Sequence, residues 1–125
     1  MTSLLLTIAF LIPISAQANE ENCLAKIIFA ESRGESIEGA IAVGQATVNR
    51  AKRTGKAICK LSGVSRLTPP DNLMAHYAAL AQSVMRGKDS IVQNSDSWNT
   101  GTKPSHAGKI VRQIGGHVFY VMSGL

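Results

Sequence analysis

The sequence predicts a small α+β domain that is mostly helical and has a short strand element near its C-terminus. Three observations lead to this fold class. A chain of 125 residues with an ordinary apolar content can build one hydrophobic core but not two. Three segments between residues 23 and 86 carry apolar side chains at helical spacing. Residues 117–121 are rich in β-branched and aromatic side chains, which is typical of a strand.

Residues 1–18 have the composition of a secretory signal peptide. The apolar run over residues 4–14 is shorter than the roughly 20 residues that span a bilayer. Small residues at Ala16 and Ala18 then suit signal-peptidase cleavage. We expect cleavage after Ala18, which leaves residues 19–125 as an exported domain, periplasmic or at the cell wall, with no membrane anchor. No Lys or Arg precedes the apolar run, so an uncleaved N-terminal anchor is the alternative.

The two cysteines, Cys23 and Cys59, both lie in the part expected to be exported. In an oxidising compartment a disulfide is the default state of such a pair. It would stabilise a domain of this size by about 4 kcal/mol. Two buried free thiols are the alternative. No histidine stands at ligand spacing from either cysteine, so we predict no metal and no cofactor.

The net charge of +5 favours an anionic partner, such as a bacterial envelope polymer, a membrane surface or nucleic acid. The basic residues are scattered along the chain and do not form the dense arm or Arg-rich helix of a nucleic-acid binder. We therefore expect no nucleic-acid partner.

The first two helices are expected in the N-terminal half of the exported domain. Asn22 is a suitable N-cap for a helix over residues 23–31. Ser36 is expected to cap a second helix, from residue 37 to about residue 52. Gly44 lowers the propensity of this second helix but allows another helix to approach it closely.

A third helix is expected to begin with Asp71 as its N-cap and to run to about Arg86, where Gly87 ends it. From Gly87 to Gly116 the sequence is mostly polar and irregular, and we expect a loop. A loop of that size in a compact domain is usually functional.

Glu31 is the sharpest candidate for a catalytic group. It ends the first helix, with Ile27 and Ile28 one turn behind it on the same side. A carboxylate beside apolar side chains is desolvated, which raises its pKa and lets it hold a proton near neutral pH. General-acid cleavage of a glycosidic bond needs such a group. The alternative is a surface glutamate paired with Lys26 or Arg33.

Several short blocks then stand out together. They are Leu24-Ala25, Glu31-Ser32-Arg33-Gly34-Glu35, Val48-Asn49-Arg50, Ile58-Cys59, Ser97-Trp98-Asn99 and the run Ile114-Gly115-Gly116-His117-Val118-Phe119-Tyr120. In residue type and order these blocks resemble the SleB/CwlJ-type cell wall hydrolases, a family known for spore-cortex-lytic enzymes. The resemblance extends over about residues 22–121.

The resemblance implies a lysozyme-like, lytic-transglycosylase-like domain that cleaves peptidoglycan glycan strands between N-acetylmuramic acid and N-acetylglucosamine. It also implies that Glu31 is the catalytic acid. In the transglycosylase version Glu31 protonates the glycosidic oxygen. It then acts as base while the muramyl 6-hydroxyl closes on the anomeric carbon, giving a 1,6-anhydro product. A hydrolytic muramidase and an amidase are the alternatives among enzymes.

Glu35 is the candidate second carboxylate, which a hydrolytic muramidase would use to activate water. Its alternative role is to order the turn after the first helix, or to pair with Arg33 or Arg50. Gly34 is expected to permit a tight turn at this place, with a positive φ.

The other residues of the matching blocks are candidates for binding and support. We expect substrate to be bound by Ser32, Trp98, Asn99, His117 and Tyr120. We expect the site to be supported by Arg33, Gly34, Asn49 and Arg50. For Trp98 the alternative to stacking on a sugar is a place in the core. For His117, a lone histidine on the terminal strand, the alternative is a structural role.

Two rival functions come from outside cell-wall cleavage. One is a non-catalytic, basic module that binds peptidoglycan. The other is a small secreted ribonuclease that uses a glutamate and a histidine. For the favoured enzyme we expect a monomer.

Overall fold

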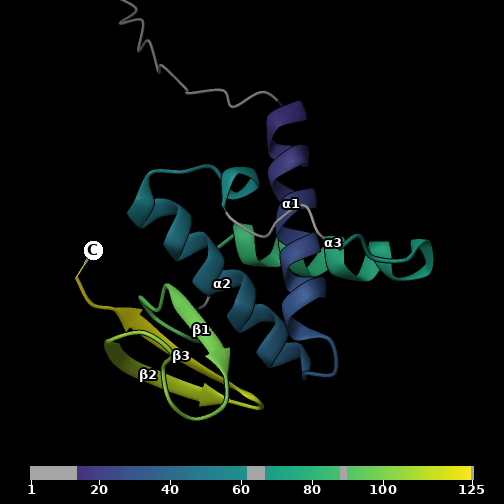
Figure 1. Cartoon of the computed structure of the whole chain (residues 1–125). Coiled ribbons are helices and arrows are strands. Elements are labelled where there is room, and N and C mark those ends of the chain that lie inside the picture. Colours follow the sequence, from purple (N-terminus) through teal and green to yellow (C-terminus); the bar gives the residue numbers. More distant parts are fainter. Residues whose placement is uncertain (1–13, 62–66, 88–89, 125) are drawn as a thin grey trace, which may run out of the picture.

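The described part of the chain contains three α-helices and a three-stranded antiparallel sheet, as expected for a mostly helical α+β domain (Figure 1). The structure is a computed structural model and describes residues 14–61, 67–87 and 90–124. In chain order the elements are α1 (Ile14–Ser32), α2 (Ile37–Thr54), the short 3-10 helix η1 (Ile58–Lys60), α3 (Asp71–Met85), β1 (Ser97–Thr100), β2 (Gly108–Ile114) and β3 (His117–Met122).

Helix α1 begins earlier than the sequence analysis predicts. Asn22 lies inside the helix, so its assignment as the N-cap is wrong. Residues 14–22 contain no Gly or Pro, and nothing in them stops a helix from extending toward the N-terminus. Cleavage after Ala18 stays a prediction. At the other end Gly34 has a φ of 82°, the left-handed conformation expected for the turn into α2.

Helix α2 lies at the centre of the molecule. Its N-cap is Ser36, as predicted, and the Ser36 hydroxyl accepts a hydrogen bond of 3.1 Å from the Gly39 N–H. Gly44 has the role expected of it. A Cβ atom there would lie 2.9 Å from Val84 Cγ2 and 3.0 Å from Ile28 Cδ1. The glycine therefore lets α1 and α3 pack tightly against the same helix.

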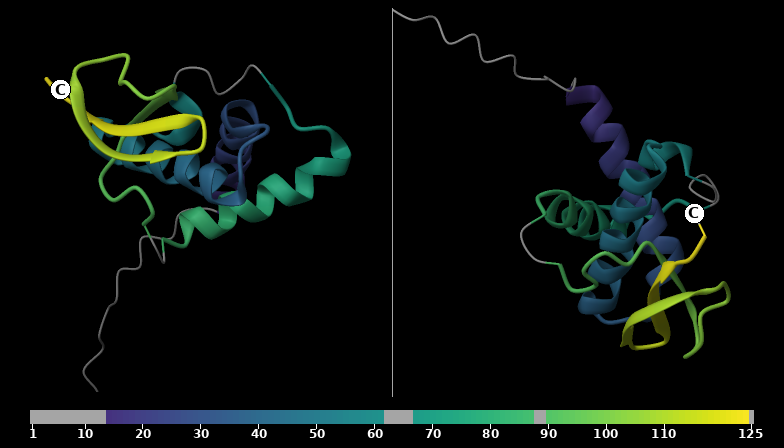
Figure 2. Two further views of the ribbon diagram at one scale, coloured as in Figure 1. Left: turned by 90° about the horizontal axis from the view of Figure 1, so that it is seen from below. Right: turned by 90° about the vertical axis from the view of Figure 1, so that its left-hand side faces the viewer.

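Helix α3 begins at Asp71, but Asp71 is not its N-cap. The cap position is Pro70, which makes no side-chain hydrogen bond. Asp71 is the first helical residue, where a carboxylate is favourable near the positive end of the helix dipole. Gly87, with a φ of 65°, ends the helix region as predicted. Figure 2 shows α3 running across α1 rather than alongside it.

The sheet contradicts the prediction of one long loop between Gly87 and Gly116, because β1 and β2 lie in that region. The strand order is β1-β3-β2, and both pairs are antiparallel. β1 has only four residues, and β2 exposes most of its side chains at the sheet edge. Neither strand therefore has the apolar alternation that identifies a strand in a sequence. β3, predicted correctly, is the central strand.

The core lies where the three helices meet, with the sheet packed against α2 (Figure 1). The disulfide between Cys23 and Cys59 is present and joins α1 to η1, with the two Cα atoms 5.3 Å apart. None of the helices in the described residues is long and apolar enough to cross a membrane.

Candidate active site

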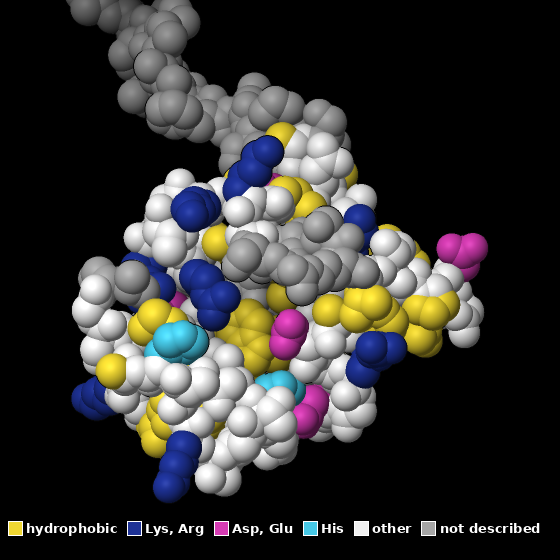
Figure 3. Space-filling model, viewed as in Figure 1, with side chains coloured by type: hydrophobic (Ala, Val, Ile, Leu, Met, Phe, Trp, Pro, Cys, Tyr) yellow, Lys and Arg dark blue, Asp and Glu magenta, His cyan; other side chains and the backbone are white. Residues whose placement is uncertain are grey.

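Glu31 borders a small pocket between α1, α2 and β1. The pocket has a volume of about 70 Å³. It is lined by Ile27, Ala30, Glu31, Thr47, Arg50, Leu61 and Trp98. On the face shown in Figure 3, hydrophobic surface at the centre lies between an acidic side chain and a basic one. The fold thus brings Glu31 together with Trp98, a predicted substrate-binding residue 67 positions further along, and with Arg50.

Glu31 lies in the last turn of α1 and is exposed. This differs from the expectation that apolar neighbours desolvate its carboxylate. Ile27 and Ile28 are buried in the core, with 8% and 0% of their surface exposed, whereas the Glu31 side chain itself is exposed. Glu31 forms no ion pair with Lys26 or Arg33 either. Its carboxylate is therefore accessible at the rim of the pocket.

Arg50 is half-buried and is held by two contacts. Its Nε donates a hydrogen bond of 2.8 Å to the carbonyl oxygen of Asp96. Its guanidinium lies over the ring of Trp98, 4.8 Å from the centroid, a favourable cation–π distance. Burial lowers the pKa of Arg50, and the nearby Asp96 charge opposes that change. The sequence analysis expects Arg50 to support the site from behind the pocket. In the structure Arg50 is one of the residues that line the pocket.

Asp96 is a functional candidate that the sequence analysis missed. Its carboxylate is buried and accepts hydrogen bonds from the Ser97 hydroxyl (2.9 Å) and the Met122 N–H (3.1 Å). It also forms an ion pair of 2.8 Å with Arg53. These contacts fix the start of β1, and with it the carbonyl that holds Arg50. An aspartate in a polar segment carries no signal of this role until the pairing of the strands is known.

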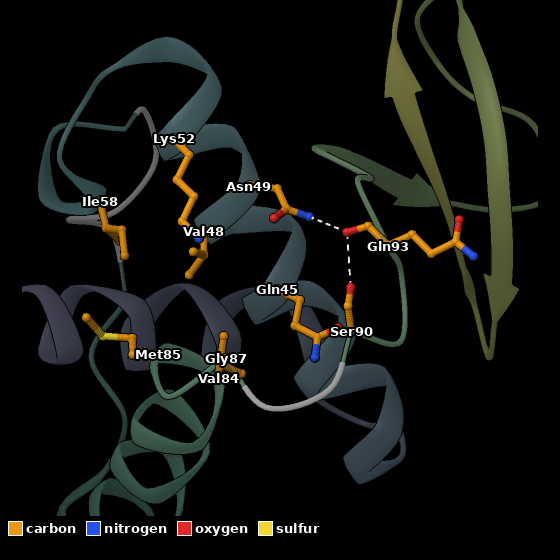
Figure 4. A pocket seen from close by; sticks show the side chains of 10 residues that line it. All are labelled: Gln45, Val48, Asn49, Lys52, Ile58, Val84, Met85, Gly87, Ser90 and Gln93. Carbon is orange, nitrogen blue, oxygen red and sulfur yellow. Dashed lines mark hydrogen bonds between the residues drawn. The ribbon is translucent and has the colours of Figure 1, made fainter.

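Asn49, predicted as a supporting residue, holds the segment before β1 by two hydrogen bonds. Its Nδ2 donates to the carbonyl oxygens of Gln93 (2.8 Å) and Ser95 (2.9 Å), as Figure 4 shows for Gln93. These bonds tie α2 to the segment that leads into β1. Ser95 is buried, and a buried backbone carbonyl needs such a partner when no strand or helix pairs it.

Asn99, predicted to bind substrate, is occupied within its own loop. Its Nδ2 donates to the carbonyls of Thr100 and Lys103, and its Oδ1 accepts from the Ser105 N–H at 2.8 Å. The side chain therefore closes the loop between β1 and β2. It is not among the residues that line the Glu31 pocket.

Glu35 and His117 lie together at the junction of the helices and the sheet. The Glu35 carboxylate accepts from the Gly116 N–H at 3.2 and 3.3 Å, and its Oε1 lies 3.4 Å from His117 Nδ1. A Cβ at Gly115 would be 2.2 Å from Glu35 Oε2, so the turn between β2 and β3 is built around this carboxylate. The Glu35 carboxylate thus holds the turn between β2 and β3. Its partners are Gly116 and His117, and not the expected Arg33 or Arg50.

Ser32 and Tyr120, two further predicted binding residues, are buried with 3% and 1% of their surface exposed. The Ser32 hydroxyl donates to the carbonyl of Ile28 within α1. The Tyr120 hydroxyl lies 3.5 Å from His106 Nδ1. Neither side chain lines the Glu31 pocket.

Arg33, the remaining predicted supporting residue, is exposed. Its guanidinium lies over the ring of Phe29 at 4.8 Å from the centroid. This contact covers an aromatic ring of the core at the end of α1. In the described parts of the chain, no group of three or more His, Cys, Asp or Glu side chains could hold a metal ion.

A larger pocket of about 370 Å³ lies on the other side of α2 (Figure 4). It is lined by Gln45, Val48, Asn49, Lys52, Ile58, Val84, Met85, Gly87, Ser90 and Gln93. Gln45, Val48 and Lys52 share one face of α2 by helical spacing, whereas Thr47 and Arg50 lie on the opposite face. None of these lining residues is acidic, so this pocket offers no general acid.

Comparisons with known proteins support the fold. No protein-family model matches the sequence, and the curated proteins contain no significant match. Among solved structures, the chain is similar to the catalytic domain of the germination-specific lytic transglycosylase SleB from Bacillus anthracis. The TM-score is 0.65 and the identity 19%, and the match covers 87% of this chain and 99% of that one.

The catalytic domain of the SleB protein from Bacillus cereus is also similar. Its TM-score is 0.59 at 19% identity, and the match covers 87% of this chain and 94% of that one. The chain therefore has the fold of the SleB catalytic domain, as the resemblance in the sequence implies.

Proposed function

We propose that this protein is a peptidoglycan-cleaving glycosidase of the lytic transglycosylase type, with Glu31 as its catalytic residue. The observation that carries the proposal is the position of Glu31. In a fold shared with a lytic transglycosylase domain, its accessible carboxylate borders a pocket that also contains an aromatic ring and a cation. Aromatic faces and hydrogen-bond donors are the groups that hold sugars.

In the proposed reaction the Glu31 carboxylic acid gives its proton to the oxygen of the glycosidic bond as that bond breaks. The resulting carboxylate then takes the proton of the muramyl 6-hydroxyl, whose oxygen closes on the anomeric carbon. The products are a free sugar hydroxyl and a 1,6-anhydro end, and Glu31 is protonated again. One carboxyl group is sufficient because the substrate supplies the nucleophile.

The position of Glu35 supports this reaction over hydrolysis by a muramidase. Its carboxylate is already engaged by the Gly116 N–H and lies beside His117. A carboxylate that activates water needs a free oxygen facing the substrate. Among the described residues that line the Glu31 pocket, Glu31 is the one acid.

The partner and location follow from the same proposal. Peptidoglycan glycan strands are the substrate, and the protein acts outside the cytoplasm. The disulfide between Cys23 and Cys59 supports export, because disulfides persist in oxidising compartments.

The test is mass spectrometry of the soluble products released from purified peptidoglycan by the protein and by Glu31→Gln. We expect anhydro-muropeptides from the unchanged protein. Since general acid–base catalysis contributes about 10²–10⁴-fold, Glu31→Gln should slow their release by about that factor. Glu38→Gln is the matched control, because Glu38 lies on α2, pairs with Arg112 and does not line the pocket.

Other products would contradict the proposal in distinct ways. Products with reducing ends would keep Glu31 as the acid but make the protein a muramidase. Release of free peptides would indicate an amidase. Binding to peptidoglycan with no released fragments would favour the non-catalytic module, and cleavage of RNA that depends on His117 would favour the ribonuclease.

A further inference from the structure

The net charge of +5 favours an anionic partner, and the Glu31 pocket, with one cation and one acid, does not account for it. Between Glu38 and Asp71 the sequence contains Lys and Arg residues but no acidic residue. This stretch includes most of α2 and all of η1. The excess positive charge therefore belongs to the C-terminal end of α2 and its surroundings.

Two hollows of about 420 and about 450 Å³ meet where this end of α2 faces the sheet. Asn94 and Val121 line both hollows, so the two form one continuous groove. Its cations are Lys52 and Arg53 from α2 and Lys109 from β2. We call it the basic groove. It shares no residue with the Glu31 pocket and lies along another face of α2.

The cations of the basic groove outnumber its acids. Among the described residues that line it, Asp96 is the one acid, and it is buried and paired with Arg53 at 2.8 Å. Lys52 and Lys109 are exposed, and neither forms an ion pair with another described residue. A negatively charged ligand in the groove would therefore meet two ammonium groups that have no countercharge.

The segment between these cations is held rigidly and presents two carboxamides. Asn49 Nδ2 donates to the carbonyls of Gln93 and Ser95, and the Ser95 N–H donates to the Val92 carbonyl at 3.0 Å. The side chains of Gln93 and Asn94 are exposed and have no hydrogen-bond partner within the described part of the chain. Each carboxamide offers donors and an acceptor, which is what a peptide bond also offers.

Gln93 has an unusual backbone conformation for a residue with a side chain. Its φ is 50°, and no other non-glycine residue in the described ranges has a positive φ. Glycine adopts this conformation at a lower cost in free energy. Strained residues of this kind cluster at binding sites. The Gln93 side chain extends toward the strands and lines the basic groove (Figure 4).

Apolar surface lies beside the charges. Ile110 on β2 is 51% exposed, Val121 on β3 is half-buried, and both line the groove. A short peptide with carboxylates, amide groups and small alkyl side chains fits all three parts of this lining, and the peptides attached to peptidoglycan are of this kind. A phosphodiester chain has acceptors only, and would leave the carboxamide N–H groups occupied but their oxygens without a donor.

We propose that the basic groove binds a peptide stem of peptidoglycan. Lys52 and Lys109 pair with its carboxylates, and Gln93 and Asn94 hydrogen-bond to its amide groups. This inference rests on the proposed function, because it takes the peptide from the polymer whose glycan strand Glu31 cleaves. Since the groove lies on another face of α2, the bound peptide belongs to a neighbouring strand of the network. Two attachments to one network raise the overall affinity above that of either site.

The test measures binding of a peptide that contains no sugar. The probes are the free stem peptide that an amidase releases from peptidoglycan, and the same peptide with its carboxyl groups amidated. We expect the free peptide to shift the side-chain amide NMR signals of Gln93 and Asn94. Because an exposed ion pair is worth about two- to fivefold in affinity, the amidated peptide should bind weaker by about that factor for each pair lost. Added salt should weaken binding of the free peptide in the same way.

Gln93→Gly separates binding from folding. It removes the carboxamide and supplies the residue that suits a positive φ. The affinity for the peptide should therefore fall by about two- to tenfold, whereas the midpoint of thermal unfolding should stay the same or rise.

Three lysine variants locate the charge effect. Lys52→Met and Lys109→Met should each weaken binding by about two- to fivefold. Lys103→Met is the matched control and should leave the affinity unchanged, because Lys103 is exposed on the loop between β1 and β2 and lines neither hollow.

Three results would overturn the inference. The first is equal affinity for the free and the amidated peptide. The second is unchanged affinity in Gln93→Gly. The third is binding of poly(glycerol phosphate) without binding of the peptide, which would make the groove a site for a phosphate polymer.

The peptide experiment and the product experiment fail independently. If the protein releases anhydro-muropeptides but does not bind the free peptide, the proposed function stands and the peptide site is wrong. If the peptide binds in the groove but no fragments are released, the site stands on a protein that binds peptidoglycan without cleaving it.

Discussion

At the scale of single residues, the partner of a side chain determines its role more than its type does. Glu31 and Glu35 are four positions apart and were both candidates for catalysis. Glu31 is exposed at the rim of a pocket, whereas Glu35 accepts hydrogen bonds from the Gly116 N–H and lies against His117. The spacing of two acids in a sequence shows neither of these partners, because Gly116 comes from the other end of the chain.

Replacing Glu35 should separate a supporting role from a catalytic one. Glu35→Ala removes the acceptor of the Gly116 N–H and should lower the free energy of unfolding by about 1 kcal/mol. Glu35→Gln keeps an acceptor oxygen and should restore most of this loss. The products should remain anhydro-muropeptides in both variants. Urea unfolding and product mass spectrometry are the measurements.

Glu38→Ala is the control for Glu35→Ala. Glu38 pairs with Arg112 at 3.0 Å, but both side chains are about half exposed, at 49% and 50%. Such an exposed pair contributes only about 0–1 kcal/mol to the free energy of unfolding.

A Glu35→Gln variant with normal stability and no activity would show that the Glu35 carboxylate takes part in the chemistry.

At the scale of elements, sequence patterns identify helices better than strands. α2 was predicted with its cap because Ser36 and the apolar spacing after it are local signals. β1 and β2 were missed because their side chains alternate poorly, and only their pairing with β3 makes them strands. The region with the weakest pattern therefore supplies Trp98 and Asp96 to the site.

Gly44 is the element-scale feature with the clearest test. An added Cβ would lie 2.9 Å from the branched side chain of Val84 and 3.0 Å from Ile28, so the packing of three helices must adjust. Gly44→Ala should therefore lower the free energy of unfolding by about 1 kcal/mol, although alanine favours a helix. Thermal unfolding is the measurement, with Ser83→Ala, at an exposed position of α3, as the control. Stabilisation by Gly44→Ala would contradict the close packing.

At the scale of the whole molecule, one covalent bond joins segments that are distant in the sequence. The Cys23–Cys59 disulfide connects the helix that carries Glu31 to η1, next to Leu61 of the pocket. A domain of this size has a small core and gains proportionately from such a cross-link. The bond also supports the expectation of an oxidising compartment.

Removing the disulfide should destabilise the fold without changing the chemistry. Cys23→Ser with Cys59→Ser should lower the free energy of unfolding by about 2–5 kcal/mol, as should reduction by a thiol. At a low temperature, at which the double variant stays folded, it should release the same products from peptidoglycan as the unchanged protein. Urea unfolding with and without a thiol tests the first part. A double variant with unchanged stability would show that the bond contributes nothing to folding.

The sequence by itself determined the mostly helical fold class, the cap of α2, the presence of strand β3, the cysteine pair and Glu31 as the candidate acid. These follow from local spacing, composition and short motifs. Only the tertiary structure decided which side chains surround Glu31. It placed Arg50, Thr47 and Trp98 at the pocket, and it turned Ser32, Asn99 and Tyr120 to other partners. The physical reason is that those neighbours are set by strand pairing and helix packing between residues far apart in the chain.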